Sequence, residues 1–322
     1  MQTNGLNNNS KVNLWTRLLG APTPAKASGL AFSFVAVFPT VLAFVFLIVV
    51  SALGLTQTDG YASQDWYLYA NFLLPQLAFA VAAFCYLKYV GMPVKQAVQK
   101  QKCHPKYYLI ALLLQIGLLS LSELNGLFLK LLGELGYQDA GISLPSLDGF
   151  GLVGVLFVVA LLPAVFEETL FRGVLLSGLK AFGKTGAILL CGGLFALYHQ
   201  NPAQTAYQFC CGAAFALVAL KAGSILPTAL AHFLNNATVI LFTKFGVNGF
   251  STPILIALII TSAVCLLGTL SYLLFFDNFD KKTKENSLKT EEKGEKKRFF
   301  LTASVGIAVC FITWISVLIA GL

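Results

Sequence analysis

Two adjacent glutamates lie inside an apolar stretch of this chain and are its strongest candidates for chemistry. The stretch covers residues 153–176, contains Glu167 and Glu168, and has Arg172 one turn later. A charged side chain near the centre of a bilayer costs at least ~2.5–3.5 kcal/mol even on lenient insertion scales. Three such side chains within six residues exceed what packing requires. The segment therefore predicts a functional site in which a carboxylate handles protons.

The helical positions of the three charges separate their roles. Residues four apart share a face of a helix, whereas neighbours point about 100° apart. Glu168 and Arg172 can therefore pair, and such a pair equally well fixes helix packing or supports a site. Glu167 points elsewhere and is left without a cation. A buried carboxylate without a partner suits a general base that takes a proton from water.

Two of the three histidines also lie in apolar stretches, and they complete a constellation with Glu167. His199 ends the run Phe195–His199, and His232 begins the run His232–Asn236. A single intramembrane histidine is often only a hydrogen-bonded packing residue. Two of them together with an unpaired glutamate predict a catalytic group.

The expected depths of these side chains follow from helix length. Counted from a turn at 180–184, Glu167 and His199 lie at a similar depth of roughly 22–26 Å, at ~1.5 Å per residue. His232 and Asn236 share a face, but counted from a turn near 223 they reach only about 13–20 Å. Straight helices would leave them short of Glu167, and either tilt or a fourth helix that extends past the headgroups would have to close the gap.

The composition predicts the elements that position these residues. Hydrophobic residues form 57% of the chain and charged residues 11%, and the mean hydropathy of +0.76 excludes an ordinary soluble protein. We expect an all-α, polytopic transmembrane helical bundle with about 8–9 spans. The nine apolar stretches, of which the fifth and sixth are short for a span, are 28–54, 66–90, 107–132, 150–178, 185–200, 205–221, 225–245, 253–276 and 299–321.

The same pattern divides the chain into four parts. Residues 1–26 form a polar cytoplasmic segment, and 27–276 form the helical membrane domain with a motif core at 150–240. Residues 277–298 form a charged cytoplasmic linker, and 299–322 a C-terminal transmembrane helix. Six of the seven cysteines lie in apolar spans, and their spacing indicates packing rather than disulfides.

Basic residues are distributed unevenly over the connectors, which predicts the orientation. Nineteen Lys and Arg fall in alternate connectors and two in the others, so the N-terminus is expected in the cytoplasm and the C-terminus outside. The net charge of +8 is therefore topological, and the lipid bilayer rather than a nucleic acid is the expected partner. The run 277–298 mixes eight basic with six acidic residues, as in a solvated linker that contacts lipid headgroups.

Three motifs resemble those of one family. Residues 167–173 match EExxFRG, residues 195–199 match FxxxH, and residues 232–236 match HxxxN. In this order and spacing they resemble the CAAX protease and bacteriocin-processing (CPBP, or Abi) family, which includes the Ras-converting CAAX endopeptidase. The resemblance covers about residues 150–240. It implies a CAAX-protease-like core in a multi-pass protein of the bacterial cell membrane.

The resemblance also implies an activity and roles for the site residues. It predicts an intramembrane endopeptidase that acts on a membrane-associated peptide or protein, which could be lipidated. Glu167 would activate water with help from His199, and His232 and Asn236 would stabilise the oxyanion. Glu168 and Arg172 would support them. Both a metal-free mechanism and a zinc mechanism are open, the latter with Glu167, His199 and His232 as ligands, although the chain has no HExxH helix.

Two other classes of function compete with a protease. A non-catalytic membrane scaffold or regulator of the same fold is the main alternative. A transporter is the other, because buried Glu and His also serve proton relays, and Glu123 with Asn125 could belong to one. The complete set of Glu, two His and Asn favours the enzyme. The chain also lacks the internal symmetry expected of many transporters.

Overall fold

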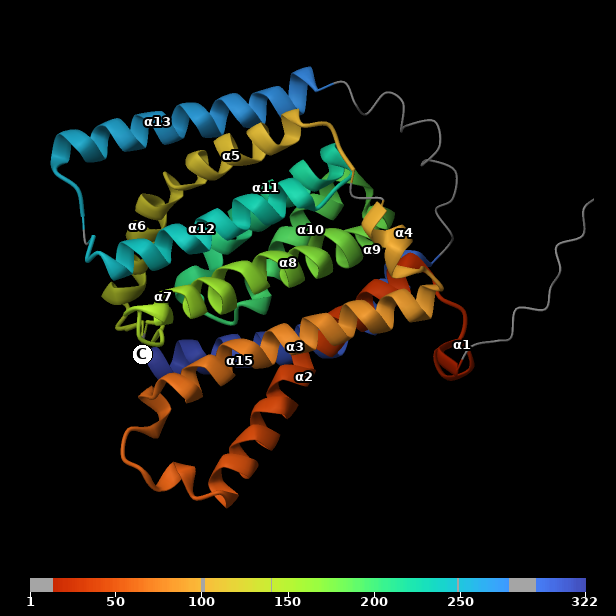
Figure 1. The fold of residues 1–322 in the computed structure, drawn as a ribbon. Coiled ribbons are helices and arrows are strands. Elements are labelled where there is room, and N and C mark those ends of the chain that lie inside the picture. The colour runs from red at the N-terminus through yellow and green to blue at the C-terminus, as the bar shows by residue number, and fades with distance from the viewer. Residues whose placement is uncertain (1–13, 100–101, 140, 248, 278–293) are drawn as a thin grey trace, which may run out of the picture.

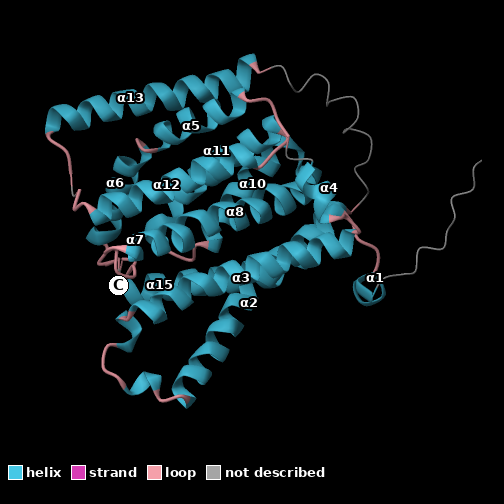
Figure 2. Ribbon diagram, viewed as in Figure 1, coloured by secondary structure: helices cyan, strands magenta, loops and turns pink. Residues whose placement is uncertain are grey.

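The structure is a computed structural model that describes residues 14–99, 102–139, 141–247, 249–277 and 294–322. Within these ranges the fold is helical throughout and contains no strand (Figure 2), so the all-α prediction is confirmed. Part of the predicted N-terminal segment, residues 1–13, lies outside the described residues. So do residues 278–293, which form most of the predicted linker.

Fourteen α-helices and three π-helical turns build the described bundle. The long helices are α2 (Pro24–Ala52), α3 (Asp65–Val90), α10 (Gly183–Tyr198), α11 (Thr205–Ala222), α12 (Leu226–Lys244), α13 (Thr252–Ser271) and α15 (Glu295–Gly321). The shorter ones are α1 (Leu14–Leu19), α4 (Val94–Gln99), α5 (Lys106–Leu118), α6 (Leu121–Glu134), α7 (Phe150–Val155), α8 (Leu162–Glu168) and α9 (Leu176–Leu179). The π-helical turns are η3 (Leu156–Leu161), η4 (Thr169–Leu175) and η7 (Tyr272–Phe276).

Six helical runs are long and apolar enough to cross a membrane, so the chain is a multi-pass membrane protein. The helices otherwise follow the nine predicted stretches, with three differences. The stretch 107–132 breaks into α5 and α6. The stretches 150–178 and 185–200 form one helical run of 49 residues that turns at Gly183, whose φ is 75°. Helix α12 is not among the six, because its apolar face carries a histidine and two asparagines.

The helices lie side by side in a layered bundle (Figure 1). Helices α13 and α5 pack together along one edge, and α2 and α15 pack together along the opposite edge. The central layer contains α8, α10, α11 and α12 (Figure 1). The residues of all three predicted motifs therefore lie on the central helices, where flanking helices cover them from both sides.

One end of the bundle gathers the connectors that are poor in lysine. The backbone N–H of Gln138 donates to the carbonyl of Gly321 at 2.8 Å, which brings the C-terminus to the connector between α6 and α7. Lys244, at the end of α12, pairs with Asp148 at 2.6 Å. We refer to this end, with the described residues of 53–64, 135–149, 199–204 and 245–251, as the lysine-poor end.

The lysine-rich connectors meet at the other end. Asp277 accepts hydrogen bonds from Lys106 at 2.8 Å and Tyr107 at 2.9 Å, and its backbone carbonyl accepts one from Lys221 at 2.9 Å. Burial raises the pKa of the Asp277 carboxyl, but the hydrogen bonds from Lys106 and Tyr107 outweigh it and hold the pKa below its usual value. These bonds fix the end of the α13–η7 run beside α5 and α11.

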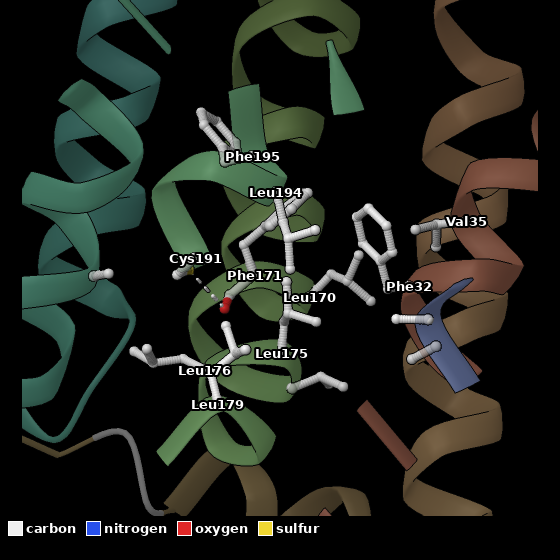
Figure 3. Packing of buried hydrophobic residues seen from close by; sticks show 14 of the residues in the cluster. Phe32, Val35, Leu170, Phe171, Leu175, Leu176, Leu179, Cys191, Leu194 and Phe195 are labelled. Atoms are coloured by element: carbon white, nitrogen blue, oxygen red, sulfur yellow. Dashed lines mark hydrogen bonds between the residues drawn. The ribbon is translucent and has the colours of Figure 1, made fainter. Parts of the chain in front are cut away.

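A hydrophobic core holds the Glu-bearing helix against its neighbours. Phe171 meets Phe195 of α10 edge to face, with ring centroids 4.9 Å apart. The Cys191 thiol donates to the backbone carbonyl of Phe171 at 3.5 Å (Figure 3). Phe32 and Val35 of α2 approach the same cluster from the other side (Figure 3). All seven cysteines are free thiols, as the sequence predicts.

Small residues let α10 and α11 approach closely, as membrane helices do at such contacts. A Cβ added to Gly192 would lie 2.8 Å from the carbonyl oxygen of Phe209 and 2.9 Å from the nitrogen of Ala213. A Cβ added to the neighbouring Gly193 would meet nothing within 4 Å. The contact therefore depends on one of the two adjacent glycines.

Gly192→Ala is expected to destabilise the protein by about 1–3 kcal/mol, because backbone atoms of α11 would have to move. Gly193→Ala is the matched control. It should be neutral or stabilising by roughly 0.5–1 kcal/mol, because alanine favours a helix. Melting curves of both variants in the same detergent measure the difference. Equal melting temperatures would contradict the close packing of α10 on α11.

Candidate active site

The two glutamates lie on a helix that is interrupted by π-helical turns on both sides of them. Turn η3 precedes α8 and turn η4 follows Glu168. Such turns are often found at functional sites. Pro163 in α8 has no N–H to donate to the carbonyl of Val159, four residues earlier. The side-chain amide of Asn236 donates to that carbonyl instead, at 3.1 Å. The sequence of α8 thus frees an acceptor that holds a predicted site residue.

Glu168 is the centre of a buried charge cluster. Its side chain is fully buried, and Oε1 accepts a hydrogen bond from Arg172 Nη1 at 2.7 Å. The same oxygen accepts one from His232 Nδ1 at 3.0 Å. A carboxylate oxygen accepts, so Nδ1 of His232 carries a proton. The predicted pairing of Glu168 with Arg172 is confirmed, and His232 is an additional partner.

Aromatic rings enclose Arg172. The guanidinium carbon lies 4.3 Å from the ring centroid of Phe195 and 5.4 Å from that of Phe215. Its Nη2 also donates to the carbonyl of Gly212 at 3.3 Å. Cation–π contacts of this kind strengthen when the cation is removed from water. The rings and the carboxylate together stabilise a charge that the bilayer would otherwise oppose.

Glu167 points away from Arg172, as predicted, and toward a cavity. It is 9% exposed, and its Oε2 lies 4.0 Å from His232 Nε2, too far for a direct hydrogen bond. Within the described part of the chain, this oxygen has no hydrogen-bond partner. Gln76 on α3 lines the same cavity. Glu167 therefore presents an acceptor that is free to receive a proton from water.

His232 reaches the glutamates, although the residue count from the turns places it shallower than Glu167. Its ring lies between the two glutamates, 3.0 Å from one and 4.0 Å from the other. The prediction assumed straight helices whose turns lie at one level. Because Asn236 contacts Val159, His232 and Glu167 differ in height by only about 6 Å at 1.5 Å per residue, and their side chains span that offset.

His199 lies at the end of α10 and faces the same cavity as Glu167. Its Nδ1 lies 2.8 Å from the carbonyl oxygen of Phe195. A carbonyl oxygen only accepts, so Nδ1 carries the proton and Nε2 of the neutral ring is an acceptor. The ring is thus fixed in orientation and tautomer. The sequence predicts that His199 lies near Glu167, and in the structure both side chains line the same cavity without a direct hydrogen bond among the described contacts.

A chain of amides leads away from Asn236. Asn236 Oδ1 accepts from Asn235 at 3.1 Å, and Asn235 Oδ1 accepts from Gln115 at 2.7 Å and from Tyr207 at 3.0 Å. The Val159 carbonyl at one end can only accept, which sets the direction of every bond in this amide chain. Gln115 Oε1 consequently remains without a donor among the described residues.

The cavity that these residues line has a volume of about 910 Å³. Its wall includes Glu167, His199, His232 and Asn236, so the structure brings all four predicted catalytic residues to one place. Sequence reasoning missed most of the wall's polar residues, for which polar side chains inside apolar stretches were the only signal. The wall as a whole contains ten side-chain amides, of which Asn236 is a predicted site residue: Asn71, Gln76, Gln115, Asn125, Gln200, Asn201, Gln204, Gln208, Asn235 and Asn236.

The predicted zinc ligands are only partly arranged for a metal. Both histidine rings donate Nδ1–H to an oxygen, as metal-binding histidines usually do. However, no group of three or more His, Cys, Asp or Glu side chains in the described residues could hold a metal ion. Zinc binding by Glu167, His199 and His232 remains a prediction.

Comparison with known proteins identifies the domain that contains these residues. The family model described as type II CAAX prenyl endopeptidase Rce1-like matches residues 149–238. Comparisons with curated proteins and with solved structures found no match. The matched residues contain all three motifs and the predicted core 150–240 almost entirely. Over residues 149–238, this multi-pass membrane protein therefore carries a domain that matches the Rce1-like type II CAAX prenyl endopeptidases of the CPBP family, and this match implies an intramembrane protease.

Proposed function

We propose that this protein hydrolyses a peptide bond of a membrane-associated peptide or protein by a glutamate-activated water. The observation that carries the proposal is the position of Glu167. It is a buried carboxylate in the wall of a large cavity, with an oxygen that lacks a partner among the described residues. Two histidines and an asparagine line the same cavity. These groups are what general-base hydrolysis of an amide needs.

The reaction follows from the acceptors and donors in the cavity. Glu167 takes a proton from water, and His199 Nε2 accepts a hydrogen bond that orients the same water. The water oxygen attacks the carbonyl carbon, and the carbonyl oxygen becomes an oxyanion. The C–N bond then breaks, and Glu167 returns the proton to the leaving nitrogen. The products are a carboxylic acid, which ionises, and an amine.

Asn236 and His232 are proposed as the donors to the oxyanion. One N–H of the Asn236 amide is used on Val159, and the second remains for the substrate. His232 uses Nδ1–H on Glu168, so it donates through Nε2 when the ring is doubly protonated. In that state the cluster of Glu167, Glu168, Arg172 and His232 has no net charge. Glu168 and Arg172 are positioning residues, because they act through His232.

Asn236→Ala is expected to lower kcat by about 10²–10³-fold, the usual effect of removing one oxyanion donor. KM should change little, because the lost contact forms in the transition state. The assay uses purified protein in detergent with an acylated, internally quenched peptide library. Asn71→Ala, which also lines the cavity, is the matched control and should stay within a few-fold of the unaltered protein. An equal loss in both variants would contradict the assignment.

The same variants separate an enzyme from a scaffold. A scaffold would complement a deletion strain fully with Glu167→Gln, His232→Ala or Asn236→Ala, and full complementation by all three would refute a protease. Metal analysis of the purified protein, together with activity before and after chelation, tests the predicted use of zinc. Loss of activity on chelation and its recovery with added zinc would support the metal-dependent alternative.

We further propose that the N-terminus lies in the cytoplasm and the C-terminus outside, in a bundle of nine spans around a CAAX-protease-like core. The separation of connectors into two ends supports this orientation, because most of the described connector Lys and Arg lie at one end and only Lys130 and Lys244 lie toward the other. The contact between Gln138 and Gly321 joins the C-terminus to the lysine-poor end.

A further inference from the structure

The cavity opens toward the lysine-poor end of the bundle. Its wall extends from Glu167 and His232 to Gln200 and Asn201 in the connector after α10. Ile142 and Leu144 of the 135–149 connector also line it, as does Thr243 beside the end of α12. Within the described residues, the connectors of the lysine-rich end contribute nothing to this wall.

The backbone at this opening is held in an unusual conformation. Gln200 has a φ of 52°, the only positive φ of a non-glycine residue in the described part of the chain. Backbone strain of this kind persists only where the surroundings impose it, and it is common at ligand sites. The adjacent Asn201 accepts a hydrogen bond from the backbone N–H of Ala203 at 2.8 Å, which fixes the turn into α11.

The wall offers acceptors without donors. Gln76 Oε1, Gln115 Oε1 and Asn125 Oδ1 are buried and have no hydrogen-bond partner in the described residues. The first two side chains belong to residues only 6% exposed. The amide chain that ends at Val159 fixes the orientation of the Gln115 side-chain amide. Turning this amide over, so that its N–H took the place of its oxygen, would break the hydrogen bond to Asn235. A ligand for this wall must therefore bring N–H donors.

The wall also lacks a fixed cation. Lys and Arg are absent from the described residues that line the cavity. Lys244, which is next to the lining residue Thr243, is paired with Asp148 at 2.6 Å. A terminal carboxylate buried here would have no lysine or arginine to pair with, and it would lie in the same cavity as Glu167.

We propose that the substrate is an uncharged internal stretch of peptide, bound in extended form through its backbone N–H groups, that enters from the lysine-poor end. Each residue of an extended peptide provides one N–H, and neighbouring residues point theirs to opposite sides. The side-chain oxygens of Gln76 on α3, Gln115 on α5 and Asn125 on α6 receive these donors. With the proposed orientation, the substrate arrives from outside the cytoplasm. A free C-terminal tail should be disfavoured as a substrate, because the described wall offers its carboxylate no lysine or arginine. This inference rests on the proposed function.

The first experiment compares two forms of one peptide. An acylated decapeptide that the protein cleaves is selected from the quenched library, then made with the scissile bond three residues from a free carboxylate or from a C-terminal amide. The amide form is expected to be cleaved at least as well. A loss of 10-fold or more in kcat/KM on amidation would overturn the inference, because hydrogen bonds to a charged group contribute about 1.5–3 kcal/mol.

The second experiment tests the backbone contact. N-methylation of single peptide nitrogens should lower kcat/KM of the unaltered protein by about 10-fold at the nitrogen that faces Gln115, as expected for one lost hydrogen bond. In the Gln115→Leu protein, N-methylation of that nitrogen should lower kcat/KM no further than the substitution itself does. The control Gln57→Leu, on the exposed connector 53–64, should respond to N-methylation like the unaltered protein. If N-methylation of every nitrogen lowered kcat/KM in Gln115→Leu as much as in the unaltered protein, the proposed contact with Gln115 would be overturned.

The third experiment is independent of catalysis. Asn201→Cys and Lys180→Cys are placed in a cysteine-free background and treated in intact cells with a membrane-impermeant maleimide. Labelling of Asn201→Cys alone is expected. Labelling of Lys180→Cys alone would overturn entry from outside, even if the peptide assay shows activity. Absence of cleavage of any library peptide would instead contradict the proposed function, so the two failures are distinguishable.

Discussion

Replacement of Glu167 by Gln should abolish cleavage and leave the fold intact. The loss should reach at least about 10²–10⁴-fold in kcat, the usual contribution of a general base. Gln has the same shape as Glu and keeps a hydrogen-bonding group, but it cannot take a proton from water. Within the described residues Glu167 also has no arginine or lysine partner, since Arg172 pairs with Glu168.

The measurements for Glu167→Gln are turnover of the selected peptide, expression level and melting temperature. Glu134→Gln, on the exposed end of α6, is the control and should retain full turnover. Full activity of Glu167→Gln would show that another group activates the water, and the catalytic assignment would be wrong. A large fall in melting temperature would show instead that Glu167 supports the fold.

Replacement of Glu168 by Gln should have the opposite pattern, with a large effect on stability. The side chain of Arg172 is fully buried and would lose its only carboxylate in the described structure. Removing one partner of a buried ion pair destabilises a protein by roughly 3–5 kcal/mol, because the remaining charge stays away from water. Activity should fall as well, since Glu168 also holds His232 at 3.0 Å.

Asp148→Asn is the matched control for Glu168→Gln, because it removes one partner of an ion pair that is exposed. Asp148 pairs with Lys244 at 2.6 Å, but its side chain is 89% exposed. Exposed pairs contribute little to stability, so the melting temperature should not change. Thermal unfolding in one detergent compares the two variants. A similar small shift in both would mean that water reaches Arg172, against the burial described above.

The amino-acid sequence by itself determines the class of protein and the local geometry of each motif. Composition predicts a helical membrane protein, and helix periodicity predicts that Glu168 meets Arg172 while Glu167 does not. Both predictions hold in the structure. Pro163 likewise frees the carbonyl of Val159 by a rule that acts within four residues. These features are predictable because a helix fixes the relative directions of residues that are close in sequence.

Only the tertiary structure decides which separate helices meet and at what height. Counting residues from the turns placed His232 too shallow, whereas helix α12 brings its ring between the two glutamates. The partner of the Val159 carbonyl, the amide chain to Gln115 and the end at which the cavity opens also depend on how the helices cross. Periodicity sets the face on which a residue lies, but tilt, rotation and the levels of the turns follow from the packing of the whole bundle.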